Sequence, residues 1–168
     1  MVSGLEQYLA PGTCAKCGGK CCQRLPGEAK PGDIVRLFGD NLQRALVAAF
    51  CTGNWVIDWW EGDPRGLEYD DPHVVDCGYY IRPRVITDTQ GKLYNGSWGG
   101  ECIFWTPEGC TLAPEERPWG CRVLEPKSGD GSECISHGSG KNEAAMAWID
   151  LHETIKDAAQ IAITIGVP

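Results

Sequence analysis

The chain has 168 residues, ten of them cysteine, and carries a net charge of −8. Its length suits one globular domain. The excess of 23 acidic over 15 basic residues argues against a protein that holds nucleic acid through phosphates or binds a membrane surface. No apolar run approaches the roughly 18 residues that cross a bilayer, and residues 1–12 lack a signal-peptide pattern. We therefore expect a cytoplasmic protein, or one incorporated into a larger particle.

The cysteines of a chain that is not secreted stay reduced, so ten of them indicate metal ligands or redox groups before disulfides. The 22 glycines and 11 prolines predict many loops and short regular elements. We expect a small, irregular α+β domain stapled by metal. Residues 1–140 would form the cysteine-cluster metal-binding domain, and residues 141–168 a long amphipathic helix packed on the same domain.

Two short helices are predicted after the first cysteines. Asp33 suits the N-cap of a helix that Gly39 ends. A second helix should begin near Asp40 or Asn41, and Cys51 at its end reads as a buried small residue rather than a ligand. The apolar stripe of this second helix consists of Leu42, Ala45, Leu46, Ala49 and Phe50.

The middle of the chain gives weaker signals. Residues 55–60 fit either a strand or a turn of helix. Residues 79–86 predict a strand that turns back into a partner near Leu93 and Tyr94, which would make one small β-hairpin.

The last segment has the clearest periodicity and predicts an amphipathic helix from near Asn142. Its polar side should hold His152 in solvent. Its apolar seam consists of Ala144, Trp148, Leu151, Ile155, Ala158, Ala162 and Ile165.

The first cysteine cluster reads C-x2-C-x3-C-C. Cys14 and Cys17 are spaced so that a tight turn can point both sulfurs at one metal. The glycines that follow let the backbone bend and aim N–H groups at sulfur. Neighbouring side chains tend to diverge, so either one of Cys21 and Cys22 binds while the other is structural, or the two serve different metals.

The second cluster contains Cys102, Cys110 and Cys121, with turns shaped by a glycine and a proline before two of them. Further on, Cys134 and His137 form a C-x2-H that could add a mixed sulfur and nitrogen ligand pair. Cys51 and Cys77 belong to neither cluster and read as core or bystander thiols. Seven tryptophans should shield the metal and fill the core.

The combination of C-x2-C-x3-C-C with a later G-x-C-x-F, G-C-x-L and R-P-x-x-C-R resembles the YkgJ-like CxxCxxCC family, described as zinc- or iron-chelating proteins. The cysteine module is also similar to part of flagellin lysine N-methylase, which implies an iron–sulfur cluster. The resemblance covers residues 14–122. It makes metal ligands of Cys14, Cys17, Cys21, Cys22, Cys102, Cys110 and Cys121, and assigns Arg117 and Arg122 as the family's arginines.

Arg117 is expected to hydrogen-bond carbonyls of the cysteine loops and to offset thiolate charge rather than to act in catalysis. The main functional hypothesis is a metal-binding protein that holds an iron–sulfur cluster, of the 4Fe–4S type, or zinc. The metal would be mainly structural, with electron transfer as a second role. A protein partner is expected, and neither nucleic acid nor a membrane.

Two alternatives belong to other classes. One is a connector subunit of a large assembly such as a virus particle, stiffened by the metal site. The other is a protein lysine methylase-like enzyme. The sequence contains no G-x-G-x-x-G loop, phosphate loop or G-x-S-x-G elbow, which disfavours the enzyme.

Overall fold

The computed structural model describes residues 17–60, 78–87, 91–96, 99–126, 134–136 and 140–168. Its helices are α2 (Pro31–Phe38), α3 (Leu42–Cys51), α4 (Trp119–Arg122), α5 (Gly140–Trp148) and α6 (His152–Thr164), with 3-10 turns at Pro114–Glu116 and Ile149–Leu151. Its strands are β1 (Trp55–Trp60), β2 (Gly78–Pro83), β3 (Trp105–Thr106), β4 (Gly109–Cys110), β5 (Leu124–Pro126) and β6 (Cys134–Ser136). This mixture of short helices and small antiparallel sheets confirms the α+β class.

The strands form three two-stranded sheets within the described residues, and β1–β2 is the longest. Ile57 of β1 lies opposite Ile81 of β2 in an antiparallel register. The expected hairpin partner was wrong, because Tyr94 bridges to Ile57 on the other edge of β1 instead of pairing with β2. All six residues of β2 are buried. The strand pairs with β1, which lies well before it in the chain, because that position covers its apolar surface.

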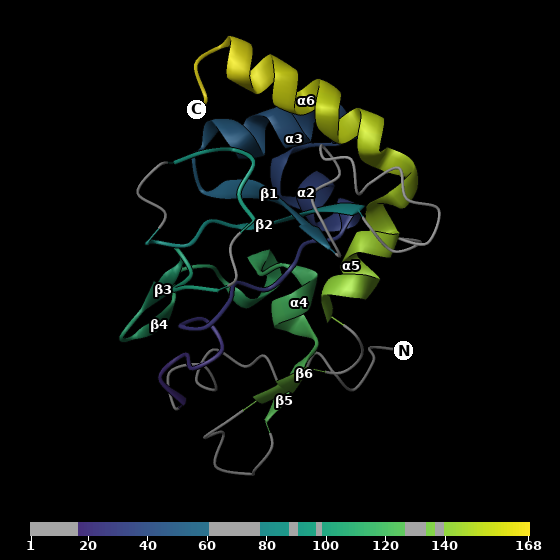
Figure 1. Cartoon of the computed structure of the whole chain (residues 1–168). Coiled ribbons are helices and arrows are strands. Elements are labelled where there is room, and N and C mark those ends of the chain that lie inside the picture. The colour runs from purple at the N-terminus through teal and green to yellow at the C-terminus, as the bar shows by residue number, and fades with distance from the viewer. Residues whose placement is uncertain (1–16, 61–77, 88–90, 97–98, 127–133, 137–139) are drawn as a thin grey trace.

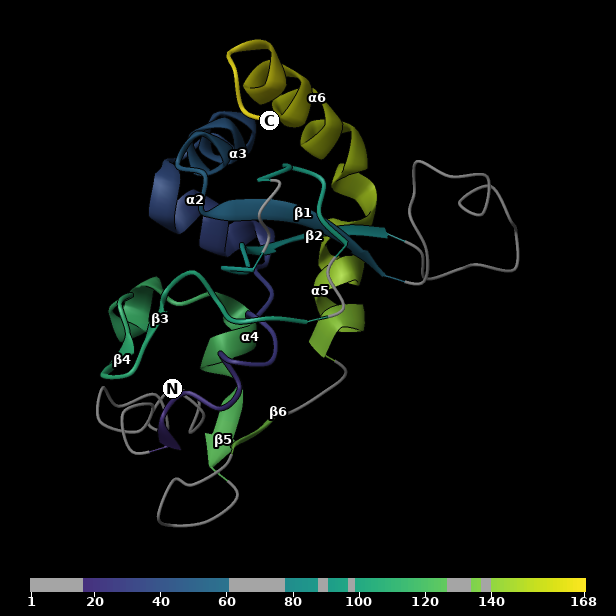
Figure 2. The same cartoon turned by 60° about the vertical axis from the view of Figure 1, so that its left-hand side comes forward.

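The β1–β2 sheet separates two layers (Figures 1 and 2). On one side α3 and α6 pack together, and α2 packs against α3. On the other side lie α4 and the small sheets β3–β4 and β5–β6. The hydrophobic core joins these helices to the sheet and includes Phe50, Trp55, Tyr80 and Trp148.

The two N-terminal helices follow the predicted apolar pattern. Ala45, Leu46, Ala49 and Phe50 of α3 are fully buried, and the Asn41 side chain caps this helix by accepting from the N–H of residue 44 at 3.0 Å. The prediction for α2 was wrong by one turn. The helix begins at Pro31, whose missing N–H costs nothing in a first turn, so Asp33 lies inside the helix rather than at its N-cap.

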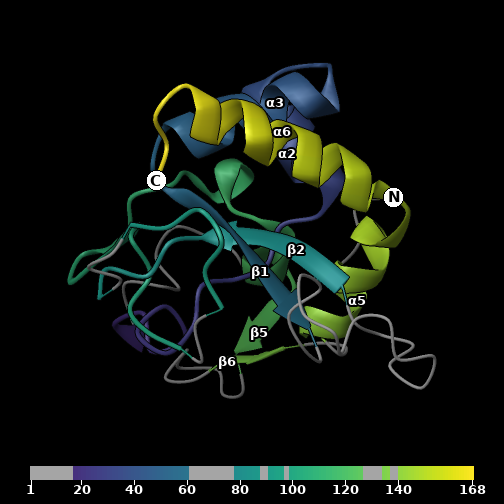
Figure 3. The same cartoon turned by 45° about the horizontal axis from the view of Figure 1, so that its top comes forward.

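The C-terminal segment is helical from Gly140, but it changes direction at the 3-10 turn between α5 and α6 (Figure 3). Most of the expected seam is buried, including Trp148 and Ile155 at 0% exposure. Ile165 at the end of the seam is 63% exposed. Among the described residues, no helix has both the length and the apolar character needed to cross a membrane.

A buried ion pair lies within the main sheet. The Nε atom of Arg82 donates to Oδ2 of Asp58 at 2.7 Å, and both side chains are almost fully buried. The guanidinium also donates to the carbonyl oxygens of Pro83 and Asn95, each at 2.9 Å. The hydroxyl of Tyr80 donates to the same carboxylate oxygen at 2.9 Å. Because these partners satisfy the pair, a charge can remain inside the fold.

His152 lies in the interior, which corrects its expected place on the solvated side of the last helix. It is 6% exposed, and its Nε2 atom accepts a hydrogen bond from the N–H of Tyr79 at 3.2 Å. The rings of these residues also meet edge to face. The periodicity assigns His152 to the polar side of one continuous helix, whereas the 3-10 turn at Ile149–Leu151 divides this segment into α5 and α6. Burial, together with the charge of Lys156, lowers the pKa of His152.

Protonation of His152 should destabilise the fold. The protonated Nε2 atom could no longer accept the hydrogen bond from the N–H of Tyr79, and two N–H groups would face each other. The folded-state pKa lies below the usual value, so stability is complete above about pH 6.5 and is lost as the pH falls from there toward the lower folded-state pKa. We expect the free energy of unfolding, from urea titrations between neutral and mildly acidic pH, to fall more steeply for the wild type than for His152→Gln. Glutamine can accept the same hydrogen bond without titrating. Equal slopes would contradict this role.

Candidate metal centre

Backbone hydrogen bonds bring the two cysteine regions together beneath the sheet. The first described residues run past α4 toward β2 (Figure 2). Along this path the carbonyl oxygen of Cys22 accepts from the N–H of Cys102, and that of Arg24 accepts from Gly100, both at 2.7 Å. The carbonyl of Glu28 accepts from the N–H of Gly120 at 2.8 Å. The early loop is thus bound to both later cysteine segments.

The main sheet fixes the position of Cys102. The chain continues past the end of β2, and Val85 forms an antiparallel bridge to Cys102. Two backbone bonds flank this bridge, from Ile86 N–H to the carbonyl of Glu101 at 2.7 Å and from Ile103 N–H to that of Arg84 at 2.9 Å. Cys102 is consequently 5% exposed and held by a rigid element.

A close backbone approach fixes the position of Cys121. This residue lies in α4, and its sulfur sits so close to Gly27 that a Cβ added there would be 2.5 Å from Sγ. A Cβ on Gly120 would likewise lie 2.5 Å from the backbone nitrogen of Glu28. Real Cβ atoms do not approach other atoms so closely, so both positions need glycine for this contact. Burial raises the pKa of Cys121, and the nearby N–H of Gly27 offsets a small part of that rise.

Five thiols share one region of the protein. The sulfur atoms of Cys21 and Cys22 lie 4.0 Å apart, so this adjacent pair converges. Charge on Cys21, Cys102 or Cys121 raises the pKa of Cys22. Charge on Cys110 raises the pKa of both Cys102 and Cys121. The described members of both predicted clusters, other than Cys17, therefore interact electrostatically at one site.

The first cluster's adjacent pair shares a proton. The hydrogen bond from Cys22 lowers the pKa of Cys21 to about 7, and Arg117 contributes in the same direction. The same hydrogen bond, burial and the neighbouring thiolates raise the pKa of Cys22. One thiolate therefore forms readily in this pair and the second does not.

Burial opposes ionisation of Cys102 and Cys121. It raises the pKa of Cys102 to about 11 and that of Cys121 well above its ordinary value. Thiols packed this closely need a cation before all of them can ionise.

Trp105 covers the start of the first cysteine loop. Its indole N–H donates to the carbonyl of Gly18 at 3.1 Å, and its ring occupies the place where a Cβ of Gly19 would lie. Gly18 and Gly19 both adopt positive φ, as expected for the tight bend after Cys17. Trp105 also pairs with Cys110 across β3–β4, so one residue connects the first loop to the second cluster.

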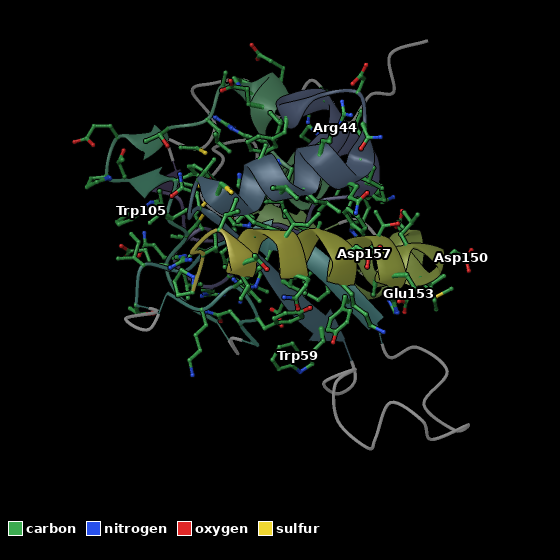
Figure 4. The ribbon with its side chains drawn as sticks, turned by 90° about the horizontal axis from the view of Figure 1, so that it is seen from above. Arg44, Trp59, Trp105, Asp150, Glu153 and Asp157 are labelled. Carbon is green, nitrogen blue, oxygen red and sulfur yellow. The ribbon has the colours of Figure 1, made fainter. Side chains whose placement is uncertain are left out.

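The arginines assigned from the sequence lie beside the thiols. Arg117 is 4% exposed, its Nε atom donates to the carbonyl of Leu112 at 3.3 Å, and its charge lowers the pKa of Cys21. Arg122 donates to the carbonyl of Arg117 at 3.1 Å and pairs with Asp33. The acidic side chains of Asp150, Glu153 and Asp157 lie on the opposite side of the molecule from Trp105 (Figure 4).

Other predicted residues fall elsewhere. Cys17 is 7% exposed and precedes the bend that Trp105 covers. Cys51 is exposed at the end of α3, so its expected burial was wrong: the helix ends there and the side chain faces solvent. Cys134 begins β6, and its side chain is not described. The remaining predicted ligands, Cys14 and His137, and also Cys77, lie outside the described residues.

No group of three or more histidine, cysteine, aspartate or glutamate side chains within the described residues already has the geometry to hold a metal ion. Comparisons of the chain with protein-family models, curated proteins and solved structures gave no match.

Three features of the site had no sequence signal that identified them. Gly27 and Gly120 resemble ordinary loop glycines, and only their contact across the fold shows why they lack a side chain. Arg82 lies in a strand, yet its buried charge lowers the pKa of Cys102. For Arg82, the one hint in the sequence was that a charged residue lies within a largely apolar strand.

Replacing Gly120 with alanine should push α4 away from Glu28. We expect the free energy of unfolding to fall by about 1–3 kcal/mol, as for other overpacked sites, and Cys121 to become more reactive toward alkylating reagents. Gly32→Ala is the matched control, because it lies in α2 with no atom within 4 Å of the new Cβ. Urea titration and mass spectrometry would measure both effects. Equal behaviour of the two variants would contradict the close contact.

Proposed function

We propose that the chain binds a metal through thiolates, and that the metal mainly holds the cysteine loops to the rest of the domain. The observation that carries this proposal is that the fold brings cysteine segments from separate parts of the chain together. The sulfurs of Cys21 and Cys22 lie 4.0 Å apart, the carbonyl of Cys22 accepts from the N–H of Cys102, and Gly27 abuts the sulfur of Cys121. Partly buried neighbouring thiols gain little from one another as neutral groups. A cation among them would favour the ionised forms that burial otherwise opposes.

The donor set fits the metals that the sequence suggests. Zinc and iron–sulfur clusters both take several cysteine thiolates. Two thiolates on one tetrahedral ion with bonds of about 2.3 Å lie about 3.8 Å apart, which is close to the 4.0 Å between the sulfurs of Cys21 and Cys22. Cys102, Cys110 and Cys121 supply further sulfur donors, and the resemblance to cysteine-cluster proteins adds Cys14 and Cys17. That resemblance is the reason to favour an iron–sulfur cluster over zinc.

The surroundings also suit a charged thiolate site. The buried charge of Arg117 lowers the pKa of Cys21, where it adds to the larger effect of the hydrogen bond from Cys22. N–H groups near the sulfurs, such as that of Gly27, disperse negative charge as they do in other thiolate sites. The metal would supply folding energy that loops with few regular elements cannot obtain from a core. Electron transfer would be added only by a redox-active cluster.

Metal content and absorption test this proposal. We expect protein purified without oxygen to contain iron or zinc in a fixed ratio to the chain. An iron–sulfur cluster would add absorption near about 400 nm, whereas zinc would leave the protein colourless. A folded chain that retains neither metal would contradict the proposal.

Cysteine replacements identify the ligands. Cys102→Ser and Cys121→Ser should lose most of the bound metal and lower the melting temperature by roughly 10 °C or more, because a structural metal contributes several kcal/mol. Cys51→Ser is the matched control and should keep both, since that thiol is exposed and distant in the chain from both clusters. Elemental analysis and thermal denaturation give the readouts. A variant with full metal content and unchanged melting has lost no ligand.

A further inference from the structure

We infer that Asp33 is a positioning residue for Cys121, and that its carboxylate ties the helix α2 to the thiol site. This inference rests on the proposed function only in treating Cys121 as a ligand. It starts from the length of α4, which has four residues and cannot maintain a helical turn by its own hydrogen bonds. Something outside α4 must hold Cys121 in place.

Asp33 supplies contacts from outside α4. Its side chain is 2% exposed. Its Oδ2 atom accepts from the N–H of Trp119, the first residue of α4, at 2.8 Å. The same oxygen accepts from the N–H of Lys30, which precedes α2, at 3.0 Å. One carboxylate thus accepts N–H groups at the starts of two helices, where negative charge is favourable.

The second carboxylate oxygen fixes the other end of α4. Oδ1 accepts from the guanidinium of Arg122, the last residue of α4, and from that of Arg36 at 3.0 Å. Arg36 and Arg122 both also donate to the carbonyl of Arg117. The helix that carries Cys121 is therefore held at its first and last residues by one buried side chain on α2.

Further contacts hold α4 against the segment that precedes α2. Gly120 N–H donates to the carbonyl of Glu28, so α4 sits directly against the chain that leads into α2. The Nζ atom of Lys30 lies 3.9 Å from the ring centroid of Trp119 and pairs with Glu143 of α5. Loss of the Asp33 contacts should release α4 while the sheet still holds Cys102.

Selective alkylation tests this positioning role. Full-length protein, as purified and after metal removal with a chelator, is treated with iodoacetamide, and the labelling of each cysteine is followed by mass spectrometry. In Asp33→Asn, an amide N–H₂ would replace one acceptor and face the donors of Arg36 and Arg122. We expect Cys121 to react about tenfold faster or more, while Cys102 changes little, because each charge-assisted hydrogen bond lost favours local opening by about that factor.

Asn41→Ala is the matched control, because it removes the cap of α3, which has no part in holding α4. It should destabilise the protein without changing the ratio of Cys121 to Cys102 labelling. Asp33→Asn should also release bound metal faster to a competing chelator. If Cys121 and Cys102 accelerate equally, or if Cys121 does not accelerate, the positioning role is wrong. If zinc and iron are absent from the purified protein but the selective labelling persists, the proposed metal function fails while the role of Asp33 stands.

Discussion

The backbone contact between Gly27–Glu28 and Gly120–Cys121 is the constraint on which the thiol site depends. At this point two chain segments meet with no side chain between them, so the sulfur of Cys121 reaches the N–H of Gly27. One residue later, the N–H of Ala29 donates to the carbonyl of Ile81 in the main sheet at 2.8 Å. The cysteine loops are thereby attached through backbone bonds to β2, all six residues of which are buried.

Some groups at this site favour neutral thiols, and others favour thiolates. The hydrogen bond with Cys21 and burial raise the pKa of Cys22, and burial raises the pKa values of Cys102 and Cys121, whereas Arg117 lowers that of Cys21. At the proposed metal site, a bound cation would favour the ionised forms that these effects oppose.

Local patterns predicted the helices well, because α3 and much of the C-terminal seam bury their apolar faces as the periodicity indicates. Among the thiols expected to be ligands, those of Cys21 and Cys22 lie 4.0 Å apart, and the carbonyl of Cys22 accepts from the N–H of Cys102. The pairing of β2 with β1 could not be predicted from the local sequence pattern. Strands pair where both become buried, and the two partners can be well separated in the chain. His152 was misplaced because the bend between α5 and α6 turns a residue from the apparent polar side into the core.

The hydrogen bond from the indole N–H of Trp148 to the carbonyl of Ala29, at 2.8 Å, joins parts of the chain that are 119 residues apart. The same residue pairs with Ile81, so the early cysteine loop is anchored by elements that are synthesised much later. During translation, Cys21 and Cys22 leave the ribosome long before these anchors exist. This anchor of the early cysteine loop therefore cannot form until α5, which carries Trp148, has been synthesised.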